Sequence, residues 1–383
     1  MFRIITGGGR NSMETIFSNF AAFTWQQAVM ILVGAVLMYL AIKKEMEPSL
    51  LLPMGFGVVL VNLPNSGAIE TIETLYNAGI ANELFPLILF IGIGAMIDFG
   101  PLLSNPKMLL FGGAAQFGIY FTLCIAVLLG FSIQDAASIG IIAAADGPTS
   151  IFVANTLHSQ YLGAIMVAAY SYMALVPVIQ PPIIKLMTTK AERKIRMAYT
   201  QREVPQIVKI LFPVVVTAIA GFVAPMSVAL VGFLMFGNLL RECGVLRNLS
   251  ETAQGPLANI ITIFLGITVA FQMQAESFLK WETLLILGLG LVGFIFDTVG
   301  GVLFAKFINL FLKKGNKFNP MIGAAGISAF PMSSRVVHKM ARDEDPYNFI
   351  LMQATAVNVS GQIASVIAGG LLMSFVVSLV TGG

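Results

Sequence analysis

The acidic residue with the most unusual surroundings is Asp146, which lies in the sequence AAADGPTS between two apolar stretches. An ionised carboxylate in an apolar membrane interior costs about 2.5–3.5 kcal/mol, so it needs a compensating partner. Gly147 and Pro148 interrupt a helix here, because proline lacks an N–H group and disfavours helical geometry in the preceding residue. The freed carbonyls and the hydroxyls of Thr149 and Ser150 can join the carboxylate around sodium or a proton. The alternative is an aspartate that only caps a half-helix.

A second Gly- and Pro-containing stretch, NPMIGAAGISAFP, offers Asn319, Gly323 and Ser328 but no acid. Its polar groups and freed backbone can bind a cation, or its small residues can serve helix packing alone. Tyr172 and Asn358 lie in the segments that follow the two stretches, in AYSYMALVP and AVNVSGQIAS. They are further candidate ligands, with hydrogen bonds between helices as the alternative.

Three other charged residues lie in or beside apolar sequence. Asp98 is predicted near a cytoplasmic helix end, where it is solvated, and Asp297 lies near the middle of an apolar segment. Asp297 is either a second ion ligand or a hydrogen-bond acceptor between helices. Arg335 follows the second stretch, where its guanidinium can bind a carboxylate or act as an ordinary cytoplasmic anchor.

The composition decides what kind of elements hold these residues. Of 383 residues, 57% are hydrophobic and 11% are charged, whereas a soluble domain has roughly 25% charged residues. The net charge of +3 is too small and too scattered for a nucleic-acid surface. At about 20 residues per crossing, the chain can supply about ten membrane crossings. The two cysteines and two histidines show no metal-site spacing.

Twelve apolar segments can be recognised, six on each side of a charged stretch at 188–206, and this equality suggests an internal repeat. The sequences that begin at Leu89 and Ile261 are similar, and Gly92 matches Gly266 at an offset of 174. The segments are 25–42, 50–63, 84–99, 108–131, 138–157, 161–187, 207–223, 227–240, 257–273, 283–312, 319–333 and 347–380.

The distribution of Lys and Arg indicates the orientation, because cytoplasmic loops carry an excess of positive charge. The stretch 185–209 contains seven Lys and Arg residues and is placed inside. Segment 319–333 has Lys and Arg on both flanks. A segment of about 15 residues with both ends inside cannot span, so it must return as a re-entrant hairpin. Segment 138–157 has no Lys or Arg in its flanks, 131–137 and 158–161, and is predicted to enter from outside.

With the hairpins left out, each half makes five crossings, and an odd number inverts the second half relative to the first. We therefore predict an all-α polytopic membrane protein with two inverted repeats, each of five crossings and one re-entrant hairpin. Both chain termini then lie outside. The predicted organisation is an N-terminal segment 1–24, a first repeat 25–187 with hairpin 138–157, a cytoplasmic basic linker 188–206, and a second repeat 207–383 with hairpin 319–333.

Five motifs together resemble the beta subunit of the biotin-dependent, sodium-translocating decarboxylases, which act on oxaloacetate, methylmalonyl-CoA or glutaconyl-CoA. They are ADGPTSIFVAN, AYSYMALVPVIQPPI, DTVGGVLFAKF, NPMIGAAGISAFPMSSRVV and NVSGQIASVIAGG, and they follow the family's order between residues 85 and 375. The first 80 residues match less distinctly. The positions that match the family's functional motif residues are Asp146, Tyr172, Asn319, Gly323, Ser328, Arg335 and Asn358.

The resemblance implies a multi-pass subunit of the cell (inner) membrane that decarboxylates carboxybiotin, consumes a proton and exports Na+. The implied partners are a carboxyltransferase alpha subunit, a biotin carrier protein that carries the carboxybiotin, a small membrane gamma or delta subunit, further beta subunits and membrane lipid. No nucleic acid is expected. The alternative function is a sodium-coupled secondary transporter of a carboxylate.

The resemblance and the flanking charges together assign roles to the matched residues. We expect Arg335 to bind the carboxylate of carboxybiotin and to form the catalytic site with Asp146 and Tyr172. The expected sodium ligands are Asp146, Asn319, Gly323, Ser328 and Asn358.

Overall fold

The computed structural model describes residues 21–197 and 203–381. The predicted N-terminal segment 1–24 and linker 188–206 therefore lie partly outside the described residues, as do the last two residues of the chain. Every regular element in the described residues is helical. The all-α class predicted from the sequence is confirmed.

The first half of the chain begins with a capped helix. The Thr24 hydroxyl accepts the N–H of Gln27 at 3.2 Å, and the Gln27 side chain accepts the N–H of Thr24 at 3.0 Å, which satisfies two donors at the helix start. The helices are α2 (Trp25–Lys44), α3 (Pro48–Val61), α4 (Ala68–Gly79), α5 (Leu84–Met96), α6 (Gly100–Ser104), η1 (Pro106–Met108), α7 (Leu109–Ala115), α8 (Phe117–Leu128), α9 (Ile133–Gly140), η2 (Ile141–Ala144), α10 (Gly147–Thr156), α11 (Leu162–Met187) and α12 (Lys190–Arg193).

The regular elements described in the second half of the chain are helical too. Its helices are α13 (Gln206–Val223), η3 (Pro225–Ser227), α14 (Val228–Glu242), α15 (Arg247–Thr252), η4 (Ala253–Leu257), α16 (Ala258–Val269), η5 (Ala270–Met273), α17 (Ala275–Phe278), α18 (Trp281–Phe311), η6 (Lys314–Asn316), α19 (Met321–Ala324), α20 (Met332–Glu344) and α21 (Leu351–Thr381).

Seven helical stretches in the described residues are long and apolar enough to cross a membrane, and an eighth is possible if α4 and α5, bent by 63°, form one span. Ten crossings would also require α3 and α14, which have 14 and 15 residues. The predicted inverted repeat with five crossings per half therefore stays a prediction.

Two elements differ from the predicted segments. Helix α4 lies outside all twelve apolar segments, because Glu70, Glu73 and Asn77 make one of its faces polar. Helix α20 starts at Met332 and continues to Glu344, whereas the predicted hairpin ends at 333. The sequence beyond residue 333 is charged, but α20 is amphipathic and buries Val337, Met340 and Ala341.

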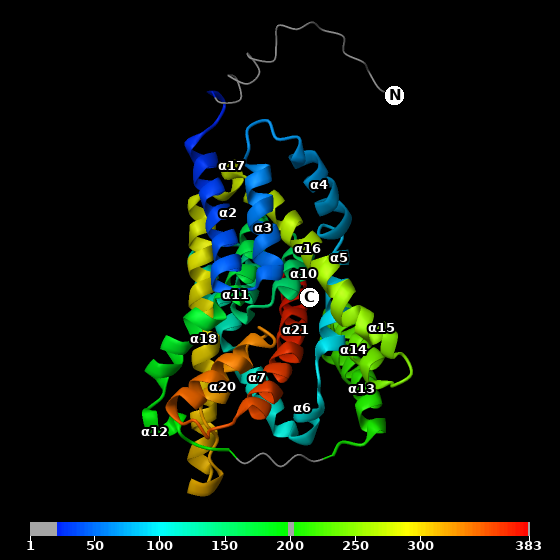
Figure 1. Ribbon diagram of the computed structural model, residues 1–383, viewed down its shortest axis with the longest axis vertical. Coiled ribbons are helices and arrows are strands. Elements are labelled where there is room, and N and C mark those ends of the chain that lie inside the picture. Colours follow the sequence, from blue (N-terminus) through cyan, green and yellow to red (C-terminus); the bar gives the residue numbers. More distant parts are fainter. Residues whose placement is uncertain (1–20, 198–202, 382–383) are drawn as a thin grey trace, which may run out of the picture.

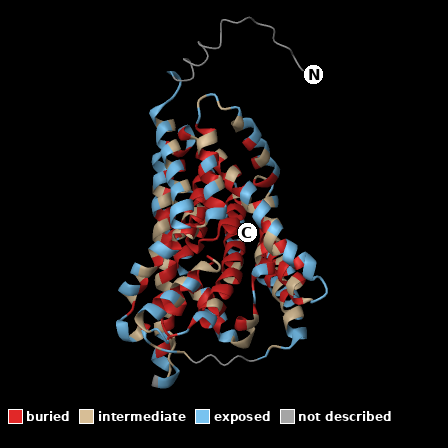
Figure 2. Cartoon of the chain, in the orientation of Figure 1, coloured by how far each residue is buried: buried red, intermediate tan, exposed pale blue. Residues whose placement is uncertain are grey.

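The helices form an elongated bundle with α4 and α17 at one end and α6, α12 and α20 at the other (Figure 1). Buried residues gather along the middle of the bundle, while the outer helices expose much of their surface (Figure 2). That exposed surface is apolar: α13 buries only Pro213 and Ala220, and Phe222 is 90% exposed. An apolar exterior of this kind is expected where lipid, rather than water, surrounds the helices.

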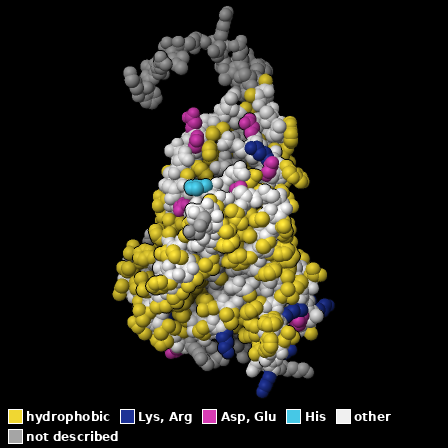
Figure 3. Space-filling view, turned by 180° about the vertical axis from the view of Figure 1, so that it is seen from behind, with side chains coloured by type: hydrophobic (Ala, Val, Ile, Leu, Met, Phe, Trp, Pro, Cys, Tyr) yellow, Lys and Arg dark blue, Asp and Glu magenta, His cyan; other side chains and the backbone are white. Residues whose placement is uncertain are grey.

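Charged side chains concentrate at the two ends. On the face in Figure 3, acidic residues and a histidine lie toward the end that carries α4, most Lys and Arg residues lie at the opposite end, and hydrophobic side chains cover the surface between. This separation of charge is typical of a protein that crosses a membrane with one end in the cytoplasm.

Glycines allow several helices to approach at backbone distance. A Cβ at Gly94 of α5 would lie 1.8 Å from the Leu234 carbonyl oxygen of α14, and one at Gly301 of α18 would lie 2.1 Å from the Gly323 carbonyl oxygen of α19. Small residues at such crossings allow the extensive van der Waals contact that holds helices together in lipid. Gly323, a predicted sodium ligand, therefore has a packing role in the structure.

Candidate functional site

Asp146 lies at the break between η2 and α10. Ala145 adopts a left-handed conformation with φ of 51°, and Asp146 is the N-cap of α10, whose first turn contains Pro148. The chain leaves the 3-10 helix here and starts a new helix, as the Gly-Pro sequence predicts. The break places a carboxylate at the positive end of a helix dipole.

The carboxylate of Asp146 is surrounded by hydroxyl groups. It is 4% exposed, and its Oδ2 atom accepts hydrogen bonds from the hydroxyls of Thr149 at 2.7 Å and Ser365 at 3.0 Å. Its Oδ1 atom accepts the backbone N–H of Thr149 at 3.2 Å. The hydroxyl of Ser150 donates to the Asp146 carbonyl at 2.7 Å. Thr149 and Ser150 thus lie at the carboxylate, as predicted.

The second break lies between α19 and α20, and side chains from other helices bind its backbone. Asn358 of α21 donates to the carbonyls of Ala325 at 3.0 Å and Ile327 at 2.8 Å. Gln116, between α7 and α8, donates to the Gly326 carbonyl at 3.3 Å. These amide groups replace the helical hydrogen bonds that the break removes, as a buried backbone requires.

The two breaks meet inside the bundle. The backbone N–H of Ser328 donates to the Ala144 carbonyl at 3.0 Å, and the Ser328 hydroxyl donates to the Gly361 carbonyl of α21 at 3.0 Å. Helix α21 therefore contacts both breaks, through Asn358 at one and Ser365 at the other. Asp146, Ser328 and Asn358, which were predicted from separate motifs, thus lie on two breaks that contact each other and share α21 as a neighbour.

The oxygen atoms at the two breaks are of the kinds that suit a hard cation such as sodium. The Oδ1 atom of Asn358 and the Oε1 atom of Gln116 are buried and have no hydrogen-bond partner in the described residues. Carboxylate, amide and hydroxyl oxygens are the ligands that hard cations prefer. No cluster of three His, Cys, Asp or Glu residues that could hold a transition metal occurs in the described ranges.

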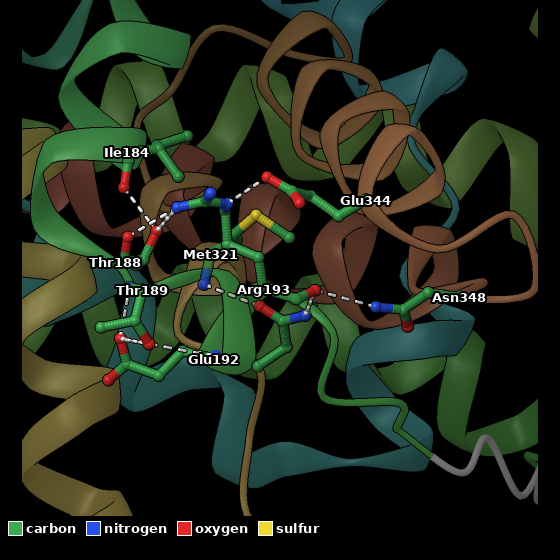
Figure 4. A network of polar contacts seen from close by, with 9 residues as sticks. Ile184, Thr188, Thr189, Glu192, Arg193, Met321, Glu344 and Asn348 are labelled. Atoms are coloured by element: carbon green, nitrogen blue, oxygen red, sulfur yellow. Dashed lines mark hydrogen bonds and ion pairs between the residues drawn. The ribbon is translucent and has the colours of Figure 1, made fainter.

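Asn319 belongs to a different network, at the end of the bundle that carries α12. Its amide donates to the carbonyls of Arg193 at 2.8 Å and Ile195 at 3.0 Å, and Asn348 donates to the same Arg193 carbonyl at 3.0 Å. Figure 4 shows Arg193 between Glu344 and Asn348, with its guanidinium 2.6 Å from the Glu344 carboxylate. In this structure Asn319 therefore attaches the linker to the second hairpin, and no described hydrogen bond connects it with Asp146.

No described hydrogen bond joins Tyr172 or Arg335 to the Asp146 carboxylate. The Tyr172 hydroxyl donates to the Leu287 carbonyl of α18. Arg335 is exposed on the first turn of α20, near Glu47 in the loop between α2 and α3. Burial raises the pKa of Glu47, and the positive charge of Arg335 partly offsets that shift.

The two aspartates of uncertain role have separate positions. Asp98 is exposed and accepts the N–H of Gly100 at 2.8 Å, in agreement with a solvated helix end. Asp297 is fully buried in α18 and accepts the N–H of Gly118 on α8. The hydrogen bond between helices, one of the two roles considered from the sequence, is therefore present, whereas the Oδ2 atom has no partner in the described residues and the role of a second ion ligand stays a prediction.

A cavity of about 490 Å³ opens at the end that carries α6. Lys107, Arg196 and Lys317 contribute to its lining, which contains no Asp or Glu among the described residues. Arg335 is not part of this lining. Arg335 and this cavity are therefore separate positively charged places on the molecule.

Sequence reasoning missed Ser365, Gln362 and Gln116. Ser365 contacts Asp146, and Gln362 donates to the Ser328 carbonyl. The signal was present in NVSGQIAS: Gln362 and Ser365 are four and seven residues after Asn358, so all three share one face of a helix. Nothing in the sequence around Gln116 indicates its role.

Comparisons with known proteins agree on one family. The family model described as the Na+-transporting oxaloacetate decarboxylase beta subunit matches residues 26–376. The methylmalonyl-CoA decarboxylase subunit beta of Veillonella parvula is 50% identical over 357 residues, which covers 93% of this chain and 95% of that protein. The glutaconyl-CoA decarboxylase subunit beta of Acidaminococcus fermentans is 50% identical over 94% of this chain and 96% of that protein. A probable oxaloacetate decarboxylase beta chain of Vibrio cholerae is 44% identical over 92% of this chain and 96% of that protein.

Proposed function

Because this chain belongs to the family of Na+-transporting decarboxylase beta subunits, we propose that it decarboxylates carboxybiotin brought by a partner and exports Na+ in the same cycle. Its family also makes it a membrane subunit of a sodium pump. The family favours this function over a sodium-coupled transporter of a carboxylate. Decarboxylation breaks the N–CO₂ bond, releases CO₂ and consumes one proton at the ureido nitrogen. The protein must therefore supply a proton where it also handles sodium.

The observation that carries the proposal is the buried Asp146 carboxylate at the meeting point of two helix breaks. A carboxylate in this position is neutralised by either a proton or a sodium ion. Exchange of one for the other couples the chemistry to transport: sodium that arrives at Asp146 displaces the proton that decarboxylation consumes. Ser328 and Asn358 add neutral oxygens to this site, and Gly323 positions the second break.

Arg335 and Tyr172 complete the proposed catalytic site in different ways. Arg335 is exposed, so its guanidinium is accessible to the carboxylate of an approaching carboxybiotin, which would replace Glu47 as its nearby anion. Tyr172 fixes α11 against α18 through the Leu287 carbonyl and so holds the segment that follows the first hairpin. Asn319 supports the second hairpin from the linker side.

An inverted repeat would provide alternating access to this site. The proposal is supported by the packing of corresponding helices. Helix α3 packs on α16 as α14 packs on α5, α11 on α18 as α21 on α7, and α10 on α11 as α20 on α21. Moving one sodium ion outward against 100 mV costs about 2.3 kcal/mol, so decarboxylation must bias which side the site faces.

The proposed complex places the basic end of the subunit, with Arg335 and the cavity lined by Lys107 and Lys317, in the cytoplasm. A carboxyltransferase alpha subunit and a biotin carrier protein bind from that side, and a small gamma or delta subunit joins in the inner membrane. Several beta subunits assemble together, with both termini of each outside.

The test uses the whole complex in proteoliposomes and follows decarboxylation of free carboxybiotin together with uptake of radioactive sodium. We expect Asp146→Asn to abolish both activities. Asp98→Asn is the matched control, because Asp98 is exposed, and it should leave both activities unchanged. Sodium movement in the absence of carboxybiotin would contradict the pump and favour the carboxylate transporter.

A further inference from the structure

Two tyrosines follow the first hairpin on α11, and their hydroxyl groups have different surroundings. The Tyr172 hydroxyl donates to the Leu287 carbonyl. Tyr170 is 1% exposed, and its hydroxyl has no hydrogen-bond partner in the described residues. Since nearly all buried polar groups in proteins are hydrogen-bonded, the Tyr170 oxygen requires an explanation.

The ring of Tyr170 lies against the helix break at Asp146. A Cβ at Gly147 would lie 2.2 Å from Cε1 of Tyr170 and 2.4 Å from Cζ, the atom that bears the hydroxyl. Only glycine at position 147 therefore allows the ring to come this close. The Tyr170 hydroxyl and the Asp146 carboxylate are close enough to interact electrostatically, although no hydrogen bond joins them.

The Oδ1 atom of Asp146, which the hydroxyl groups do not contact, can accept a further contact. Oδ2 accepts from the hydroxyls of Thr149 and Ser365, whereas Oδ1 accepts, among the described residues, only the Thr149 N–H at 3.2 Å. Each oxygen that ligates a hard cation such as calcium lies about 2.3–2.6 Å from the ion. The distance between two such oxygens is therefore longer than the distance between two hydrogen-bonded oxygens. A buried phenol oxygen that is near a carboxylate, with no described hydrogen bond between the two, fits such a bridging arrangement.

We propose that the Tyr170 hydroxyl is a ligand of the sodium ion that Asp146 binds. The inference rests on the proposed function, since it takes Asp146 as the sodium site. Sodium is then held between the first helix break and α11, the helix that follows it. Tyr170 supplies a neutral oxygen, and Tyr172, the tyrosine that matches the family motif, positions α11.

The test is Tyr170→Phe, which keeps the ring over Gly147 and removes only the oxygen. Equilibrium binding of radioactive sodium to the purified complex is measured without carboxybiotin, and the decarboxylation rate is measured against sodium concentration. We expect the sodium dissociation constant and the half-saturating sodium concentration to rise roughly tenfold. The maximal rate at saturating sodium should be largely kept, as should the unfolding temperature.

Tyr120→Phe is the matched control, because Tyr120 lies on α8 and is 43% exposed, and it should not change sodium binding. Unchanged sodium affinity in Tyr170→Phe, with binding lost in Asp146→Asn, would overturn this inference and leave the proposed function intact. A lower maximal rate with unchanged affinity would also overturn it, since that pattern marks a structural role. Wild-type decarboxylation that is independent of sodium would instead overturn the proposed function.

Discussion

At the scale of single residues, the site depends on hydroxyl groups that come from distant parts of the chain. Ser365 lies 219 residues after Asp146, and its hydroxyl donates to the Asp146 carboxylate at 3.0 Å. A hydrogen bond to a charged group contributes about 1.5–3 kcal/mol, which is comparable to the cost of keeping a carboxylate charged in a membrane. Ser365 therefore helps to keep the Asp146 carboxylate ionised, as the proposed sodium site requires.

Replacing Ser365 with alanine should weaken sodium binding roughly tenfold or more, because one donor to the Asp146 carboxylate is lost. The readout is the sodium concentration at half-maximal decarboxylation. Ser374→Ala is the control on the same helix, since the Ser374 hydroxyl donates only to the Gly370 carbonyl of its own helix, at 2.9 Å. Equal effects of the two substitutions would contradict the role given to Ser365.

At the scale of helices, the position of the second break depends on the contact between α18 and α19. Gly301 and Gly323 touch through their backbones, whereas Gly288 of the same helix α18 has open space around it. Gly301→Ala should destabilise the protein by about 1–3 kcal/mol, because the added methyl group forces the helices apart. Gly288→Ala should be neutral or stabilising by up to about 1 kcal/mol, since alanine favours the helix. Unfolding temperatures of the two variants in detergent provide the comparison.

The linker is attached to α20 by ion pairs that depend on pH. The hydrogen bond from Arg193 lowers the pKa of Glu344, and the one from Arg196 lowers the pKa of Asp345. A lowered pKa in the folded state adds stability above the ordinary carboxyl pKa of about 4, and that stability is lost as the pH falls through the lowered value. The attachment should therefore be complete at pH 7 and weaken below about pH 4.

Glu344→Gln should release the linker at pH 7, so that backbone amides in residues 188–197 exchange hydrogen several-fold faster, as measured by mass spectrometry. Glu251→Gln is the control, because Glu251 pairs with Arg247 on the exposed helix α15 and does not contact the linker. At pH 4 and below, the difference between Glu344→Gln and wild type should shrink. A variant with wild-type exchange at pH 7 would show that the Arg193 pair does not hold the linker.

At the scale of the whole molecule, the charge distribution predicts which end faces the cytoplasm. Glu73 lies on α4 at the acidic end and Lys339 on α20 at the basic end, and both are exposed. In a chain whose Cys124 and Cys243 are replaced by serine, Glu73→Cys should react with a membrane-impermeant thiol reagent on intact cells. Lys339→Cys should react only after the membrane is opened. The reverse pattern would invert the proposed topology. Labelling of both variants on intact cells would place both ends of the bundle outside.

The sequence by itself determined the class of protein and the location of the first helix break. A chain with 57% hydrophobic residues must bury its helices in lipid. The sequence Asp146-Gly147-Pro148 favours a helix start, because aspartate is a good N-cap and proline is tolerated in the first helical turn. The motifs also identified the family, which the comparisons confirm.

The tertiary structure decided which side chains meet, because that depends on how each helix is rotated and packed against distant helices. The motifs pointed to Tyr172 and Asn319, yet the first donates to Leu287 and the second to the carbonyls of the linker. Ser365 donates to Asp146, and the ring of Tyr170 lies against the neighbouring Gly147. Their position depends on α21 crossing both breaks and on glycine at 147, and these are relations in space that no local pattern contains.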